Sequence, residues 1–468
     1  MQNPFLVREI HFEFPACAVG ITDGSERGEY VPQSYLVSRF GRPHHAVNLM
    51  FQYYPDLQGW PTQGVKWHGF YRNNSLNKGD GYFPFVLENE GPWGQFFLRQ
   101  IEDVRSHGQE PLLTLTLHAD TPDEDLVRIA RSLSPYAPMK IRINHECNGE
   151  WFYFSQRWSY KQVSDFFIRF HNILHEHAPG VKTVACWNGR AEAHGQPLET
   201  LKPWGTLAEN ELGPMFKKAD VISFDQYASL HWGWPDPDFD PHKPSQFFSV
   251  PFEVWWLELE KTHRMMTELR GGEVDIEVHE INQDAEVVGP AEQAAWIQRF
   301  YLEVATGKYP WLKNVTYYQL RDRGGLGLEK EDVEDPSVFQ VRPSFDVYRE
   351  VLRHPYFGLP VAVGNAVTPS SELKTIWTGP CSSTGYQFEY AVPAGVREVV
   401  VNFGGRAHLL AGSGAEWKVV KLGESRVSFR RETSTDVFIL RVFMPPRDGR
   451  NNTGGAFQSM IKNLPVVV

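Results

Sequence analysis

The segment 142–152, which reads RINHECNGEWF, carries carboxylates, an imidazole, amides and two aromatic rings. It follows a short apolar run, 139–143, that is typical of a β-strand. Charged groups at the end of an apolar strand cost free energy unless they are paired or used. If this strand belongs to a β/α barrel, its C-terminal end lies on the catalytic face. Glu146 is therefore the first candidate for acid–base chemistry, whereas Glu150 lies beyond Gly149, outside the strand.

A second candidate carboxylate follows another strand-like run, 274–278, which leads into His279 and Glu280. In a barrel, catalytic groups come from the ends of different strands. Glu277 competes with Glu280 for this role. Strand alternation places the apolar side chains at even positions of this run on the same face as Glu280, and we expect that face to fill the barrel interior. Glu277 is then expected to face the helix layer, so we choose Glu280.

The segment 142–152 resembles the acid/base segment of the clan A glycoside hydrolases, most closely family 26, the β-mannanases. That family's pattern is Arg-x-x-x-His-Glu-Met-Asn-Gly-x-Trp. The matching residues at the same spacing are Arg142, His145, Glu146, Asn148, Gly149 and Trp151. Cys147 stands where the family usually has Met, and the likeness covers roughly residues 110–325. The run 317–321 lacks the Trp that clan A often has there, and 278–282 reads VHEIN instead of the familiar Glu-Phe-Gly. The clan is therefore better supported than family 26.

The resemblance implies a retaining β-glycoside hydrolase on a (β/α)8 barrel, with Glu146 as acid/base and Glu280 as nucleophile. The two carboxyls would then lie about 5–5.5 Å apart. Glu146 needs a raised pKa to be protonated near neutrality. Glu280 needs hydrogen-bond donors, and we expect them to be Arg142, which shares strand parity with Glu146, and Tyr227, which resembles the clan A tyrosine that holds the nucleophile.

Other residues near these strand ends are candidates for substrate binding. Asn144 and His145 are expected to bind sugar hydroxyls next to the scissile bond, and His145 is equally consistent with a buried structural imidazole. Trp151, which matches the family pattern, and Trp187 are expected to stack on sugar rings. His118, at the end of another strand, is expected to contact a neighbouring subsite.

The order of predicted elements favours an α/β fold. Strand-like runs are predicted at 17–21, 46–53, 112–117, 139–143, 182–186, 220–224, 274–278 and 315–320. Helical patterns follow most of them, and this β-then-α alternation indicates parallel strands in a (β/α)8 barrel. Thr121 to Glu124 and Ser159 to Gln162 read as capping boxes at helix starts.

The pattern changes near residue 355, where short alternating runs replace the helices. We therefore divide the chain into a barrel at 1–355 and a small antiparallel β-sandwich at 356–468. The second part is expected either to bind sugar, through Trp377 or Trp417, or simply to support the barrel.

Composition excludes several classes of function. The net charge of −11 and the lack of a Lys/Arg block argue against nucleic acid as a partner. No apolar run of about 18 residues predicts a membrane span. No signal peptide is visible, so we expect a cytoplasmic protein, or a secreted one if the chain has been trimmed. The four widely spaced cysteines are expected to be reduced.

Three alternatives to the leading interpretation remain. The protein could be an exo-β-glycosidase of the same clan for another sugar, or an inactive carbohydrate-binding barrel. A metal-dependent barrel hydrolase using His44, His45 and His118 is less favoured, because the first strand has no HxH and no suitable lysine follows. We expect a carbohydrate substrate, no cofactor and no metal. The oligomeric state and the choice between internal and terminal cleavage stay open.

Overall fold

The structure is a computed structural model. It describes residues 7–10, 16–23, 30–61, 79–91, 93–107, 109–189, 207–232, 240, 242–322, 324–331 and 339–358, and the backbone of the strands between 366 and 462. Cys381, one of the four cysteines, lies outside these ranges, as do the side chains of Trp377 and Trp417, which were considered for sugar binding.

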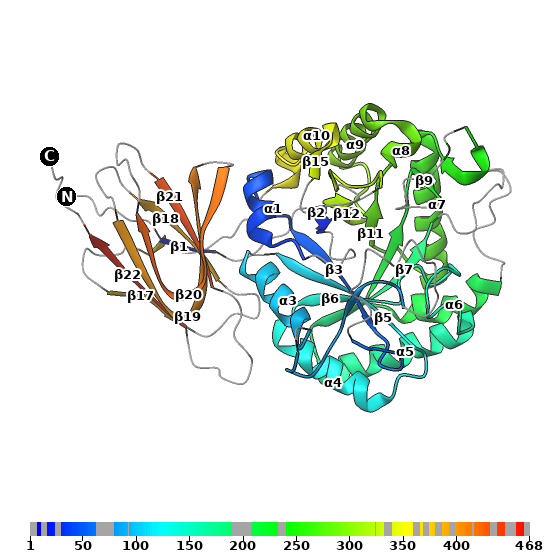
Figure 1. Ribbon diagram of the computed structural model, residues 1–468, viewed down its shortest axis with the longest axis horizontal. Helices are drawn as coiled ribbons and strands as arrows, with labels where there is room; N and C mark the ends of the chain where they lie inside the picture. The colour runs from blue at the N-terminus through cyan, green and yellow to red at the C-terminus, as the bar shows by residue number, and fades with distance from the viewer. Residues whose placement is uncertain are drawn as a thin grey trace.

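Eight parallel strands close into a barrel (Figure 1). In chain order they are β2 (Ala18–Thr22), β3 (Ala46–Tyr53), β5 (Glu110–Leu117), β6 (Met139–Ile143), β7 (Val181–Asn188), β8 (Val221–Asp225), β11 (Ile276–Ile281) and β12 (Leu312–Tyr317). Each strand pairs with its neighbour in this order, and β12 pairs with β2 to close the ring. The short β4 (Phe83–Pro84) pairs with β3. The predicted (β/α)8 barrel is thus confirmed, and each predicted barrel strand overlaps an observed one.

Helices surround the barrel (Figure 1). They are α1 (Gln33–Phe40), α3 (Phe96–Ser106), α4 (Asp123–Leu133), α5 (Tyr160–His177), α6 (Leu207–Lys218), α7 (Phe252–Arg270), α8 (Ala285–Val288), α9 (Pro290–Ala305) and α10 (Pro343–Val351). Short 3-10 turns lie at η4 (Ser134–Tyr136), η6 (Pro244–Gln246) and η7 (Pro355–Phe357). Small strands on the rim are β9 (Ser229–His231), β10 (Phe247–Ser249), β13 (Arg321–Asp322), β14 (Glu329–Glu331) and β15 (Phe339–Val341).

Of the two predicted capping boxes, one is confirmed. The Ser159 side chain accepts from the Gln162 backbone and the Gln162 side chain accepts from the Ser159 backbone at the start of α5. The box at Thr121 is wrong: α4 is capped by the extended residue Pro122, without a side-chain cap. The Thr121 hydroxyl donates instead to the backbone oxygen of His118, 2.8 Å away.

The polar interior of the barrel corrects the parity argument about Glu277. Lys140 on β6 lies 2.8 Å from the carboxylate of Glu277 on β11 and 3.0 Å from that of Glu110. Because β7 and β8 separate β6 from β11 in the sheet, the Lys140–Glu277 pair must cross the interior. Glu277 therefore faces inward, not toward the helix layer. Glu280 also faces inward, since the register of β11 shifts after Val278 and breaks the simple alternation.

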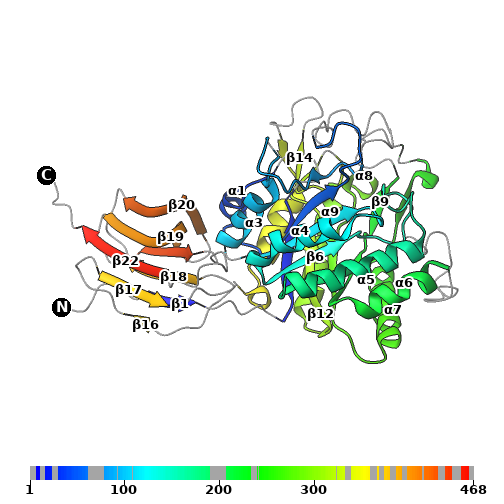
Figure 2. The same cartoon turned by 90° about the horizontal axis from the view of Figure 1, so that it is seen from below.

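The strands described after residue 358 belong to one antiparallel sheet (Figures 1 and 2). They are β16 (Ala366–Val367), β17 (Lys374–Gly379), β18 (Tyr386–Val392), β19 (Glu398–Ser413), β20 (Glu416–Arg430), β21 (Phe438–Met444) and β22 (Gly455–Lys462). The N-terminal strand β1 (Val7–Ile10) pairs antiparallel with β18 and β16. The start of the chain therefore joins this sheet before the barrel begins. The sandwich arrangement itself stays a prediction.

Two further expectations concern the chain as a whole. Within the described ranges, no helix has the length and apolarity needed to cross a membrane. Cys17, Cys147 and Cys186 are buried free thiols.

Candidate active site

A sharp backbone turn after β6 presents Glu146. Asn144 and Glu146 both have positive φ, at 48° and 49°, which is uncommon for residues other than glycine. The side chain of Asn144 holds this turn, because its amide bonds both the backbone N–H and the carbonyl of Leu117 at the end of β5. Strain of this kind persists where the surroundings enforce it. Asn144 therefore positions the turn, and its expected contact with a sugar hydroxyl stays a prediction.

The carboxylate of Glu146 accepts hydrogen bonds from two neutral donors. Asn188 Nδ2 lies 2.7 Å from Oε1, and Trp151 Nε1 lies 2.7 Å from Oε2. Asn148 fixes Asn188 by bonding its backbone N–H and carbonyl. Burial and the nearby charge of Glu280 raise the pKa of Glu146 to about 8, although the two donors oppose this shift. At neutral pH Glu146 is therefore mostly protonated, as a general acid must be.

Glu280 is bound by a cation and a phenol. Arg142 Nη2 lies 2.6 Å from Oε1, and the Tyr227 hydroxyl lies 2.7 Å from Oε2. Glu280 is only 4% exposed, so these donors replace water around its carboxylate. A charge-assisted hydrogen bond such as that from Arg142 is shorter and stronger than one between neutral groups, so it fixes the orientation of the carboxylate. Both donors that the sequence analysis chose thus contact Glu280.

Arg142 is itself fixed by further acceptors inside the barrel. Its Nη1 lies 2.7 Å from Oδ1 and 2.8 Å from Oδ2 of Asp225, and its Nε donates to the Thr114 hydroxyl at 2.8 Å. Burial would lower the pKa of Arg142, but the carboxylates of Asp225 and Glu280 raise it above its ordinary value. The guanidinium is therefore a permanent cation with every group engaged, and its orientation toward Glu280 is rigid.

His145 lies beside the nucleophile candidate. Its Nε2 lies 3.3 Å from the Tyr82 hydroxyl and 4.0 Å from Oε1 of Glu280. Its ring packs on that of Phe152, with centroids 4.4 Å apart. Burial and the charge of Arg142 lower the pKa of His145 well below its ordinary value, so the imidazole is neutral. Its Nδ1 is buried without a hydrogen-bond partner among the described residues.

Trp151 is a partly exposed aromatic residue beside Glu146. It is 48% exposed, and its indole lies directly over Gly149. A Cβ at position 149 would lie 2.3 Å from the Trp151 ring, which is far inside van der Waals contact. Gly149 therefore permits the close approach that lets the indole N–H reach Glu146. The exposed ring face is available to a sugar.

Two residues of the expected set lie apart from this cluster. Trp187 is only 5% exposed, and its ring meets that of Phe216 on α6 in an edge contact with centroids 5.8 Å apart, so its expected stacking on a sugar stays a prediction. His118 is held by Asp56 at 3.0 Å and contacts Arg157, which makes it part of a rim network beside β5. Trp232, on the β9–β10 side of the rim, is 47% exposed and packs on Phe248.

The sequence analysis missed four residues that shape the site. Asn188 and Asn148 orient Glu146, Asp225 orients Arg142, and Tyr82 contacts His145. Asn148 belongs to the matched pattern, and Asn188 and Asp225 stand at predicted strand ends, so position alone could have indicated them. Tyr82 lies 63 positions before His145 in the sequence, and no spacing rule connects the two.

The metal alternative finds no geometric support in the described residues. His44 contacts the Tyr348 hydroxyl, and His45 accepts from the backbone of Val19. His44, His45 and His118 belong to none of the clusters of possible metal ligands found among the described residues. A different cluster does include His145, Asp225 and Glu280. The Arg142 guanidinium already pairs with both carboxylates of that cluster, Asp225 and Glu280.

No protein-family model and no curated protein match the sequence. Among solved structures, the chain is similar to a family 51 α-L-arabinofuranosidase from Thermotoga petrophila RKU-1, at 10% identity over 93% of this chain and 98% of that chain, with a TM-score of 0.43. It is similar to a family 26 β-mannanase from Bacteroides ovatus, at 14% identity over 73% and 89%, with a TM-score of 0.42. It is also similar to a family 39 glycoside hydrolase from Bacteroides cellulosilyticus WH2, at 10% identity over 92% and 81%, with a TM-score of 0.43. At this level of similarity the argument for function rests on the residues of the site.

Proposed function

We propose that this protein is a retaining β-glycoside hydrolase that acts on a β-linked glycan or oligosaccharide. Glu146 serves as the acid/base and Glu280 as the nucleophile. The observation that carries the proposal is the contrast between the two carboxyls. Glu146 has neutral donors and a pKa raised to about 8, while Glu280 is bound by the permanent cation of Arg142. Glycoside hydrolysis requires one carboxyl that donates a proton and a second that attacks the anomeric carbon, and the different partners of the two carboxyls fit these two roles.

In the first step, Glu280 attacks the anomeric carbon while Glu146 donates its proton to the glycosidic oxygen. The bond between that carbon and oxygen breaks, and a covalent glycosyl-enzyme remains. Glu146 is then ionised. In the second step it takes a proton from water, the resulting hydroxide equivalent attacks the anomeric carbon, and Glu280 leaves. The anomeric configuration is retained because each step inverts it once.

The surrounding residues fit this sequence of steps. Arg142 and Tyr227 hold the Glu280 carboxylate in one orientation, which lowers the entropic cost of attack. Trp151 and Asn188 orient the proton donor. His145, neutral and next to Glu280, is placed to hydrogen-bond a sugar hydroxyl.

The sugar is proposed from the resemblance of 142–152 to the family 26 pattern, which makes β-mannan or a β-mannoside the first substrate to try. Trp151 offers an exposed ring face for stacking. Aryl β-glycosides of several sugars belong in the same panel, since another clan A exo-β-glycosidase activity would use the same two carboxyls.

The test compares Glu146→Gln and Glu280→Gln with the parent. We expect Glu280→Gln to lose turnover on all substrates. We expect Glu146→Gln to lose it on substrates with poor leaving groups but to retain formation of the glycosyl-enzyme from an activated aryl glycoside, whose leaving group needs no proton. The product's anomeric configuration, followed by NMR, should match that of the substrate.

Glu150→Gln is the matched control, because Glu150 is exposed and four positions from Glu146. It should retain parent activity. Turnover that survives both Glu146→Gln and Glu280→Gln would refute the proposal. An inactive parent that nevertheless binds oligosaccharide would identify the carbohydrate-binding alternative.

We further propose that residues 1–355 form the catalytic barrel and 356–468 an accessory module. The antiparallel pairing of the strands after residue 358 supports this division. The pairing of β1 with β18 would add the first strand of the chain to that module.

A further inference from the structure

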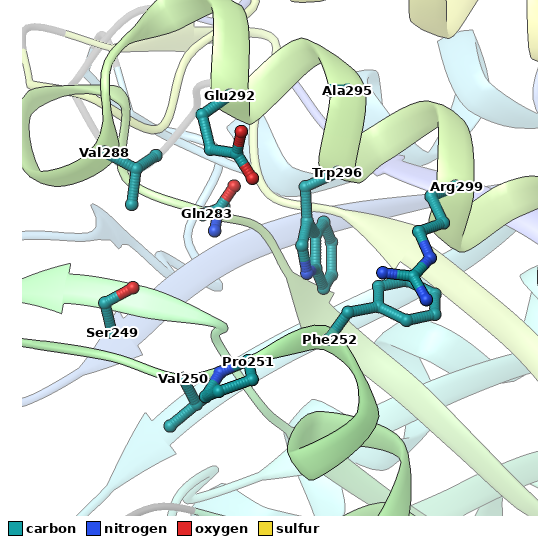
Figure 3. Close-up of a pocket in the computed structure, with 10 residues that line it drawn as sticks. All are labelled: Ser249, Val250, Pro251, Phe252, Gln283, Val288, Glu292, Ala295, Trp296 and Arg299. Carbon is teal, nitrogen blue, oxygen red and sulfur yellow. The ribbon is translucent and has the colours of Figure 1, made fainter.

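A pocket of about 430 Å³ lies between the starts of α7 and α9 (Figure 3). Its lining comes from β10 and the start of α7, which follow β8, and from the segments that follow β11. In a β/α barrel these segments border the C-terminal face, where substrates bind. Gln283, one of the lining residues, stands three positions after Glu280. The pocket is within the usual size range of ligand sites, roughly 300–1,000 Å³.

The amide of Gln283 points into this pocket (Figure 3). Its backbone is fixed, because its N–H donates to Asn282 Oδ1 and its carbonyl accepts from Gln293 Nε2, both at 2.7 Å. Gln283 is only 4% exposed, yet its side-chain oxygen has no hydrogen-bond partner among the described residues. A buried polar group without a partner costs about 1–3 kcal/mol. An amide held in this way is a ready acceptor for a ligand hydroxyl.

A donor lies on the opposite wall. The Trp296 ring extends from α9 toward the space between Gln283 and Phe252 (Figure 3). Trp296 is 5% exposed, and its indole N–H also has no partner within the described part of the chain. The pocket lining thus includes an unused acceptor and an unused donor, together with the apolar side chains of Val250 and Val288.

The charges around the pocket are largely compensated. Arg299 lies over the Phe252 ring, 3.9 Å from its centroid, and pairs with Glu253 at 2.5 Å. The carboxylate of Glu292 extends toward the Gln283 amide (Figure 3). A cation already paired with a carboxylate does not favour an anionic ligand, and the remaining carboxylate would repel one. The paired charges and the unpartnered donor and acceptor together favour a neutral ligand with several hydroxyl groups.

We propose that this pocket is a second carbohydrate subsite, which binds a sugar unit of the glycan away from the bond that is cleaved. The inference rests on the proposed function, since it concerns the same substrate. Binding energy from a remote sugar unit would strengthen the binding of long chains and leave short ones unaffected.

The test fills the pocket without disturbing the core. Ala295 lines the pocket from an exposed position on α9, so Ala295→Trp should fill it while the fold is kept. Gln298→Trp, exposed on the same helix and not a lining residue, is the control. We expect Ala295→Trp to raise KM for a β-1,4-mannohexaose by about tenfold, the effect of roughly one net hydrogen bond, with unchanged kcat. KM for an aryl β-mannoside should not change.

A second variant, Gln283→Leu, removes the amide at similar volume. It should raise KM for the hexaose in the same way, while the melting temperature stays level or increases because the unmatched buried oxygen is gone. A purely structural glutamine would show a lower melting temperature and no dependence on chain length. Equal effects of Ala295→Trp on the long and short substrates, or none on either, would overturn the subsite.

A failure of the proposed function is recognised separately, because the parent would then hydrolyse no member of the panel. In that case calorimetric titration of parent and Ala295→Trp with hexaoses of β-1,4-mannose, β-1,4-glucose and β-1,4-xylose decides the subsite alone. Binding that is weaker for Ala295→Trp than for the parent supports the subsite. Equal binding to both proteins, or no binding to either, refutes it.

Discussion

Arg142 and Glu280 meet across the interior of the barrel, with Nη2 2.6 Å from Oε1. They stand on β6 and β11, which are separated in the sheet by β7 and β8. The same guanidinium holds Asp225 through its other terminal nitrogen. One buried cation therefore sets the position of the proposed nucleophile. It also links β6 to β11, two strands that share no backbone hydrogen bonds.

Replacing Arg142 with lysine should reduce both activity and stability. An ammonium cannot donate in the fixed fork that reaches Asp225 and Glu280 together. Loss of one preorganised donor of this kind lowers kcat by about 10²–10³. Disrupting a buried pair costs about 3–5 kcal/mol of unfolding free energy. Steady-state kinetics and urea unfolding measure the two effects.

Arg128→Lys is the comparison for that variant. Arg128 pairs with Glu88 at 2.7 Å, but both side chains are about half exposed, at 46% and 60%. An exposed pair contributes about 0–1 kcal/mol, so this change should leave stability and kcat near the parent values. Equal losses in the two variants would show that Arg142 has no special role.

The pH profile should show the raised pKa of Glu146. A general acid works in its protonated form, so kcat/KM should fall as the pH rises through about 8. Trp151→Phe removes the N–H that favours the ionised form of Glu146, so the pKa should rise and the alkaline limb should move to higher pH. An unchanged limb in this variant would mean that another group controls it.

Glu146 should also cost the protein stability at alkaline pH. Burial raises its pKa in the folded state to about 8, above the ordinary value of 4.5, so the folded state binds its proton more tightly. The contribution of this tighter proton binding to folding stability is fully present below pH 4.5 and is lost as the pH rises through the folded pKa. Glu146→Gln should therefore stabilise the protein more at pH 8 than at pH 5. Melting temperatures at the two values provide the measurement, and a pH-independent difference would contradict it.

Strong local patterns explain what could be predicted of the fold. The limits of β3 and β6 were predicted correctly because apolar runs that end in polar residues mark them in the sequence. The ends of β11 were less accurate: the run 274–278 corresponds to Ile276–Ile281. A register shift has no sequence signature as clear as a Gly or Pro.

The site residues were predicted from strand alternation and side-chain type. Glu280 was chosen over Glu277 by alternation, and that reasoning was wrong, because both side chains face the interior. Asn144 and Trp187 were assigned to substrate because their side chains can bind sugars. Which atoms a backbone turn or a neighbouring helix already engages depends on tertiary packing, and a single sequence does not specify it.

Gly149→Ala should reduce activity without unfolding the protein. The added methyl would lie 2.3 Å from the Trp151 ring, so the indole must move and its N–H loses Glu146. Misplacement of a catalytic contact by about 1 Å can cost about 10²-fold in rate. Gly272→Ala is the control, because a methyl there meets nothing within 4 Å. Activity equal to that of the control would show that the position of Trp151 is unimportant.

Glu277→Gln should separate the two interior glutamates of β11. Although burial would raise it, the charge of Lys140 holds the pKa of Glu277 below its ordinary value, so Glu277 is an ionised partner of that lysine. Removing its charge leaves Lys140 with Glu110 alone and should cost on the order of 3 kcal/mol of unfolding free energy. Its kcat should stay near that of the parent, whereas Glu280→Gln should be inactive at any temperature where it is folded. Urea unfolding and kinetics on the same preparations decide the matter: an inactive but stable Glu277→Gln would transfer the nucleophile's role to Glu277.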